Sequence, residues 1–264
     1  MSGHSKWAKI KRAKGATDSA RGALFTKLSQ AITIAAEEGG GDPNFNFTLR
    51  LAVDKAKEAN MPSGNVERAI KKGTGELKSE KIERITYEGY GPFSVALLID
   101  TQTDNSNRTV SDVRNTIEML GGKLGSAGSV GWQFEEKGLV VVLPARLKHA
   151  EKYGQGDSYE PVDSSAVELE ILEIDGVEDI REEKVEGEDG NKIDVLEIFC
   201  AKGDLAKVRE GIEKLNLKIE NAEIIKMAKD KIKLEDGQKE KINNIVEKLE
   251  ELDDVVSVWT NAEQ

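Results

Sequence analysis

The order of strand and helix patterns in the second half of the chain constrains its fold more than any other feature. Apolar residues there predict a strand at 139–143, a helix at 164–174, a hairpin from 177–184 and 193–199, a further helix, and a strand at 222–227. The second helix carries an apolar stripe at a 3.6-residue period, formed by Leu205, Val208, Ile212 and Leu215. The order βαββαβ predicts a ferredoxin-like unit, in which two helices cover one face of an antiparallel sheet.

The first 75 residues predict helices only. Three apolar stripes at helical spacing run through Leu24–Ala36, through Leu49–Ala56 and through Val66–Ile70. The glycines at 39–41 would end the first helix, because glycine takes the left-handed C′ conformation at little cost. Pro62 would end the second helix, and Ser63 is a candidate cap for the third.

The region between these two parts is incomplete by itself. Strands are predicted at 82–87, 95–99 and 130–134, with a helix whose stripe ends at Leu120. The missing helix and strand are supplied near the C-terminus, at 242–252 and 255–259. We therefore predict an α+β multidomain fold: an N-terminal three-helix domain at 1–78, an α/β domain made of 79–136 plus 233–264, and a ferredoxin-like domain at 137–232 inserted into it.

Charge is divided unevenly along the chain. Residues 1–78 hold 14 Lys and Arg against 8 Asp and Glu, a net charge of +6, whereas residues 79–264 carry −17. Within the first 27 residues, 7 basic residues face a single acidic one. A basic end on an acidic body predicts a polyanionic partner that binds at that end. A solvated charge run is the alternative, but Trp7 within the run favours a contact site.

Several other classes of protein are excluded or disfavoured by composition. The longest apolar runs have five residues, against the ~20 that a membrane-spanning helix needs. The N-terminus shows no secretory signal, and one cysteine cannot form an internal disulfide, so we expect a cytoplasmic protein. With only His4 and His149 and an apolar setting for Cys200, we expect no metal site, no cofactor and no enzymatic activity.

Three segments could carry chemistry or have only structural roles. The glycines between 121 and 131 lack the spacing of a phosphate-binding loop and are better interpreted as a helix cap and turn. Tyr87 and Tyr90 could stack on a base or pack on the sheet, and packing is favoured for Tyr87 while Tyr90 stays open. Polar residues at a helix start could cap it or contact phosphate or a partner; they are Asn105, Asn107, Arg108 and Arg114.

An ordered set of short motifs resembles the YebC/PmpR family of transcriptional regulators, which includes a mitochondrial translational activator of a cytochrome oxidase subunit. The set opens with GHSKWAKIK at residues 3–11 and includes GGGDP at 39–43, ERAIKKG at 67–73, YEGYGP at 87–92, TDNSNRT at 103–109 and GGKLG at 121–125. The resemblance covers residues 3 to about 134. It implies three domains, a cytoplasmic location and association with nucleic acid, with no known catalytic centre.

The predicted nucleic-acid-binding residues are basic or aromatic and lie in the helical region: His4, Lys6, Trp7, Lys9, Lys11, Arg12, Lys14, Arg21, Lys27, Arg68, Lys71 and Lys72. Lysine and arginine suit phosphate, and Trp7 offers a stacking face. The leading interpretation is a DNA-binding transcriptional regulator. Its alternative is a ribosome-associated translation factor that binds ribosomal or messenger RNA, and a third is a protein-binding scaffold that acts through the acidic domains.

Overall fold

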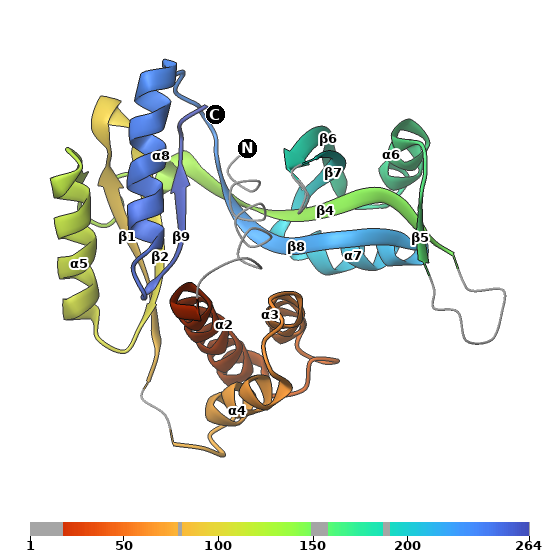
Figure 1. Cartoon of the computed structure of the whole chain (residues 1–264), viewed down its shortest axis with the longest axis horizontal. Coiled ribbons are helices and arrows are strands. Elements are labelled where there is room, and N and C mark those ends of the chain that lie inside the picture. Colours follow the sequence, from red (N-terminus) through yellow and green to blue (C-terminus); the bar gives the residue numbers. More distant parts are fainter. Residues whose placement is uncertain (1–17, 79–80, 149–157, 187–190, 264) are drawn as a thin grey trace. The chain divides into compact units, whose positions relative to one another are not determined.

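The computed structural model describes residues 18–78, 81–148, 158–186 and 191–263 (Figure 1). Its described residues up to Glu135 and from Met227 onward form one compact unit, and Glu136–Lys226 form a second. The chain thus leaves the first unit after Glu135 and returns to it at Met227. A helical region followed by two antiparallel sheets confirms the predicted α+β multidomain fold.

The N-terminal helical region consists of α2 (Asp18–Gly39), α3 (Phe47–Glu58) and α4 (Ser63–Gly73). Its core joins the predicted stripes, and its fully buried members include Ile32, Leu49 and Ala56. Asn46 caps α3, because its side-chain oxygen accepts a hydrogen bond from Leu49 N at 3.0 Å. The predicted cap at Ser63 is wrong: Ser63 is the first residue of α4, and Pro62 precedes it without a side-chain cap.

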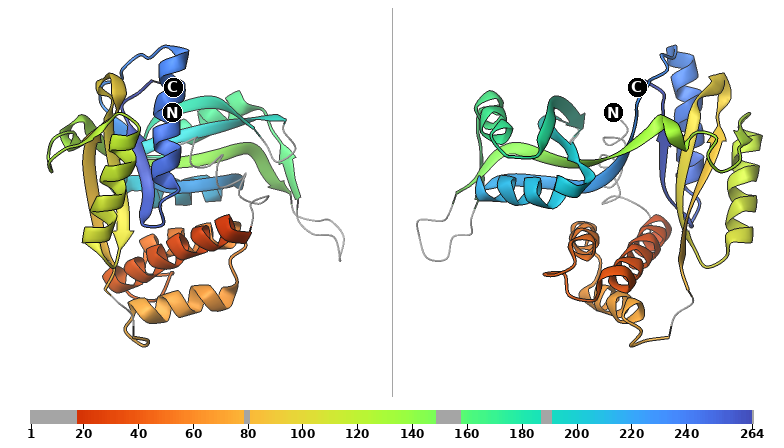
Figure 2. Two further views of the ribbon diagram at one scale, coloured as in Figure 1. Left: turned by 60° about the vertical axis from the view of Figure 1, so that its left-hand side comes forward. Right: turned by 180° about the vertical axis from the view of Figure 1, so that it is seen from behind.

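The sheet of the first unit has the strand order β3-β1-β2-β9. Its strands are β1 (Glu83–Tyr90), β2 (Ala96–Thr103), β3 (Lys123–Leu124) and β9 (Val255–Thr260), and the short turn η2 (Pro92–Ser94) joins the first two. The helices α5 (Ser106–Met119) and α8 (Asp236–Glu250) pack side by side on this sheet (Figure 1; Figure 2). They bury Ile117 and Ile245 against Leu97 and Ile99.

The predicted strand at 130–134 is wrong. The segment forms the short turn η3 (Gly131–Gln133), and β3 pairs with β1 at this edge instead. The reason is a carboxylate: Val130 N and Gly131 N each donate to Glu88 Oε2 at 2.7 Å, so neither is available to a strand ladder.

The second unit follows the predicted βαββαβ order, with one extra short strand. Its elements are β4 (Phe134–Lys148), β5 (Ser158–Pro161), α6 (Ser164–Leu172), β6 (Val177–Glu186), β7 (Lys192–Ala201), η4 (Lys202–Asp204), α7 (Leu205–Lys214) and β8 (Leu217–Ala228). The sheet order is β5-β4-β7-β6, and β8 also pairs with β4. Cys200 is buried in this sheet, as its apolar setting predicted.

Candidate nucleic-acid interface

Seven of the twelve predicted binding residues lie outside the part of the chain that the structure describes: His4, Lys6, Trp7, Lys9, Lys11, Arg12 and Lys14. They stay predictions. The other five, Arg21, Lys27, Arg68, Lys71 and Lys72, belong to α2 and α4, and the candidate interface is built from these two helices.

The helix α4 presents a polar stripe at helical spacing. Asn65, Arg68 and Lys72 follow one another at intervals of three and four residues, so they share one face of the helix. The buried Val66 contributes to the core, while Arg68 and Lys72 are exposed. Because Arg68 and Lys72 lie one turn apart, their charges reinforce each other at one place on the surface.

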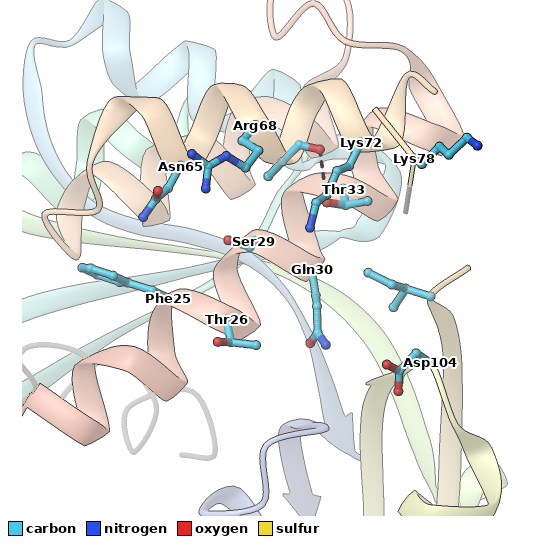
Figure 3. Close-up of a pocket in the computed structure, with 12 residues that line it drawn as sticks. Phe25, Thr26, Ser29, Gln30, Thr33, Asn65, Arg68, Lys72, Lys78 and Asp104 are labelled. Atoms are coloured by element: carbon cyan, nitrogen blue, oxygen red, sulfur yellow. Dashed lines mark hydrogen bonds between the residues drawn. The ribbon is translucent and has the colours of Figure 1, made fainter. Parts of the chain in front are cut away.

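A groove of about 620 Å³ separates this stripe from α2. Figure 3 shows Arg68 and Lys72 along one wall, with Thr26, Ser29 and Gln30 of α2 along the other. Lys78 extends the basic wall beyond the end of α4. Three of the lining residues are cationic, and Asp104 is the single carboxylate among them. The arrangement suits an anion that accepts hydrogen bonds from both walls.

Close packing sets the distance between the two walls. Thr33 Oγ1 donates to the carbonyl of Ala69 at 3.1 Å. Gly73 brings α4 still closer, because a Cβ atom there would lie 2.2 Å from the carbonyl oxygen of Thr33 and 2.7 Å from the Cβ of Ala36. These contacts hold α2 and α4 at a fixed distance next to Lys72, one of the basic residues of the groove.

One polar atom of the groove lacks a partner among the described residues. Gln30 Oε1 is buried and accepts no hydrogen bond there. Gln30 lines the pocket, and Figure 3 shows its side chain extending from α2 away from Arg68 and Lys72, on the side of the pocket where Asp104 lies. An unpaired acceptor in such a place favours a ligand group or water that donates to it.

The other three basic residues are placed differently. Lys27 is half-buried, and its ammonium donates to the carbonyl of Glu250 at 2.7 Å, at the C-terminal end of α8. Arg21 is exposed in the first turns of α2, and Lys71 is exposed but does not line the groove. The structure thus brings Arg68 and Lys72 together with Lys78, a residue that the sequence did not single out.

The structure also bears on the other segments that the sequence suggested could carry chemistry: a metal site, the glycines between 121 and 131, and the two tyrosines. The described residues contain no cluster of three His, Cys, Asp or Glu side chains that could hold a metal ion. Gly121 has φ +81°, and its N–H binds the carbonyl of Glu118, so it ends α5 as predicted. Tyr87 packs against the sheet core, also as predicted, whereas Tyr90 is exposed.

Two of the four polar residues named at the start of α5, Asn105 and Arg108, stabilise the fold. Asn105 caps the helix by accepting from Arg108 N at 3.1 Å. The Arg108 guanidinium binds Asp254 and Asp104, and these hydrogen bonds raise the pKa of Arg108 above its usual value. Capping, one of the two roles open from the sequence, is therefore the role of Asn105.

Together these features define a multidomain α+β protein whose helical region carries a basic groove. The chain belongs to the TACO1/YebC family. Residues 5–76 match the TACO1/YebC protein N-terminal domain, and residues 82–262 match the TACO1/YebC second and third domain. This confirms the resemblance drawn from the short motifs.

Similar proteins extend along the whole chain. A probable transcriptional regulatory protein of Dehalococcoides mccartyi is 44% identical over 263 residues, covering 100% of this chain and 95% of its own length. A probable transcriptional regulatory protein of Pelotomaculum thermopropionicum is also 44% identical, covering 100% of this chain and 99% of its own length.

A solved structure shares the fold. The crystal structure of a conserved hypothetical protein from Aquifex aeolicus matches with a TM-score of 0.76 at 37% identity, over 93% of this chain and 91% of that one. Within the described residues, no helix is both long enough and apolar enough to span a membrane.

Proposed function

We propose that this chain is a nucleic-acid-binding regulator of gene expression, a DNA-binding transcriptional regulatory protein rather than an enzyme, which acts in the cytoplasm. The observation that carries the proposal is the groove between α2 and α4, with Arg68, Lys72 and Lys78 along one wall. The names of the relatives, probable transcriptional regulatory proteins, support a regulatory role.

The contact is electrostatic and reads no sequence by itself. Arginine and lysine neutralise backbone phosphates, and such contacts fix position without distinguishing bases. The hydroxyl of Ser29 and the amide of Asn65 add polar groups that suit phosphate and sugar oxygens. The basic arm at residues 1–14 would add to the same binding, because it precedes α2 in the sequence by only a few residues.

RNA is the second candidate ligand, and with it a role in translation. The exposed residues of α4 weaken the case for sequence reading: Ser63, Gly64, Glu67, Arg68, Lys71 and Lys72 include no asparagine or glutamine, the side chains that read adenine in the major groove of DNA. The one amide of the helix, Asn65, is partly buried. A surface that binds phosphate without reading bases serves RNA as well as DNA. The ligand is therefore tested in three forms: duplex DNA, single-stranded DNA and structured RNA.

The test uses the full chain with Arg68→Ala and Lys72→Ala combined. Loss of two phosphate contacts should weaken binding to every sequence about equally and lower the slope of log affinity against log salt by about two. The matched control combines Lys192→Ala and Lys214→Ala, which removes the same charge from exposed positions of the second unit. Polarisation of labelled nucleic acid gives the affinities.

Two results would count against the proposal. Equal affinity of the groove variant and the control variant would show that the groove does not contact the nucleic acid. A sequence-selective loss would show that these side chains read bases and do not simply hold the backbone. A preference for structured RNA over both DNA forms would identify RNA as the ligand and favour the role in translation.

A further inference from the structure

A second surface of the first unit has the chemistry of a stacking platform. Trp132, in η3, is 67% exposed, and Tyr90, at the end of β1, is 36% exposed. Both polar edges bind one acceptor: Tyr90 Oη donates to the carbonyl of Ser129 at 2.9 Å, and Trp132 Nε1 donates to the same oxygen at 3.2 Å. The two aromatic side chains are thereby held beside each other, with their hydrogen-bond donors already used.

The loop under the two rings is fixed by a carboxylate. Glu88 accepts from Gly128 N at 2.7 Å through Oε1, and from Val130 N and Gly131 N at 2.7 Å through Oε2. The Glu88 carbonyl also accepts from Gly125 N at 2.8 Å. A loop held by four such bonds presents Trp132 in one position, so the exposure of this indole is built into the fold.

Lysines lie around the rings. Lys123 is exposed on the edge strand β3 and is the register partner of Tyr90. Lys229 is exposed, and its ammonium donates to the Trp132 carbonyl at 2.8 Å. The carboxylate that binds this loop, Glu88, is partly buried, and backbone N–H groups donate to both of its oxygens. Two exposed lysines thus lie next to the rings.

We propose that Tyr90 and Trp132 form a second nucleic-acid contact, which stacks on unpaired bases while Lys123 and Lys229 hold the adjacent phosphates. Single-stranded nucleic acids are bound by this combination of aromatic faces and cations, because every base has a π-face. Duplex DNA keeps its bases stacked inside and cannot use the rings. The inference rests on the proposed function for the class of ligand, but it concerns different residues and predicts a different ligand preference.

The fluorescence of Trp132 provides a readout at the site itself. The sequence has three tryptophans, and Trp7→Phe leaves only Trp132 and Trp259. Trp259 is 4% exposed and donates its indole N–H to Asp100 at 2.8 Å, so it contributes a constant signal. Titration of this otherwise intact chain with oligo(dT), oligo(U) and duplex DNA should quench the emission with the single strands and leave it nearly unchanged with the duplex.

Affinity measurements complete the test. Trp132→Ala should weaken single-strand binding by roughly five- to a hundredfold and leave duplex affinity within about twofold. Tyr90→Phe keeps the ring and removes only its hydroxyl, so it should retain most of the affinity. Met119→Ala is the control, because Met119 is also an exposed apolar residue, at 84%, and should leave both affinities unchanged. Circular dichroism of each variant shows that the fold is kept.

The outcomes separate this inference from the proposed function. If single strands bind without quenching the emission, and bind the Trp132→Ala variant as tightly as the protein that keeps Trp132, the platform is overturned. The groove proposal would then still stand. If single strands quench Trp132 and the combined Arg68→Ala and Lys72→Ala variant binds with unchanged affinity, the platform is supported and the groove proposal is contradicted. Quenching on protein concentration alone, without nucleic acid, would identify a second copy of the chain as the occupant and overturn the inference.

Discussion

Arg108 and Asp254 face each other across a separation of 146 residues, with guanidinium Nη2 at 2.9 Å and 3.1 Å from the two carboxylate oxygens. The pair joins the first turn of α5 to the turn between α8 and β9. Thr109 Oγ1 donates to Asp254 at 2.7 Å, and Thr103 Oγ1 donates at 3.2 Å. The segment between α8 and β9 is therefore attached to the start of α5 by a polar cluster, in which Arg108, Thr103 and Thr109 all bind the buried carboxylate of Asp254.

Asp254→Asn should destabilise the first unit. The amide keeps the shape of the carboxylate but turns one acceptor into a donor, which then faces Arg108 and the two hydroxyls. Hydrogen bonds to charged groups contribute about 1.5–3 kcal/mol each, and Arg108 is half exposed, so we expect a net loss of about 1–3 kcal/mol. Urea denaturation measures it. Asp253→Asn, at the exposed neighbouring position, should change the unfolding free energy far less, and equal losses would refute the role of the cluster.

Glu88→Ala should release the loop that carries Trp132. The substitution leaves the N–H groups of Gly128, Val130 and Gly131 without their acceptor, at about 1–3 kcal/mol for each group that stays buried. Hydrogen exchange of these three amides should accelerate more than exchange in β2. Glu118→Ala, at an exposed position of α5, is the control. Unchanged protection of the three amides would contradict the carboxylate clamp.

Cys200 should be inert in the folded chain. Burial, with smaller contributions from nearby carboxylates, raises the pKa of its thiol from 9.0 to about 11. Because only the thiolate reacts, alkylation at pH 8 should be far slower in the native protein than in denaturant. Between pH 9 and 11 the unfolded chain loses this proton while the folded chain keeps it, so stability falls as pH rises through that window. Cys200→Ala should remove this part of the pH dependence, and fast native alkylation would contradict the burial.

The sequence predicts most of the fold because the period of apolar residues is a local property. The stripe that ends at Leu120 becomes α5, and the βαββαβ order of the second unit is present as predicted. The edge of the first sheet could not be predicted. Val130 and Phe134 suit a strand, but the acceptor for the segment's N–H groups is Glu88, more than 40 residues earlier.

The candidate site is predictable only in part, for the same reason. The spacing of Arg68 and Lys72 identifies one basic face of α4 from the sequence alone. The opposite wall comes from α2, whose distance is set by the contact of Gly73 with Thr33, and no local pattern encodes that contact. Trp132 gives no signal either, since its exposure depends on the clamp at Glu88.

Salt should control nucleic-acid binding by the intact chain. About four to six phosphate contacts from the basic arm would give a log–log slope of roughly −3 to −5. Combined replacement of Lys9, Lys11 and Arg12 by alanine should lower this slope and weaken all sequences alike, because these residues position the ligand and do not read it. Polarisation titrations over a range of salt concentrations give the slope. An affinity independent of salt would contradict an electrostatic contact.

Gly73→Ala tests whether the groove depends on the packing of α2 against α4. The added methyl would lie 2.2 Å from the Thr33 carbonyl oxygen, so α4 must move away from α2. Overpacking of this kind costs typically about 1–3 kcal/mol, and the displaced wall should weaken nucleic-acid binding beyond what the lost stability explains. Gly64→Ala is the matched control in the same helix, because a Cβ there meets nothing within 4 Å. It should leave binding nearly unchanged and stability unchanged or slightly raised, since alanine favours a helix more than glycine does. Thermal melts and polarisation titrations on the two variants decide the matter. Normal binding by a destabilised Gly73→Ala variant would separate the ligand contact from the groove and place it on the basic arm alone.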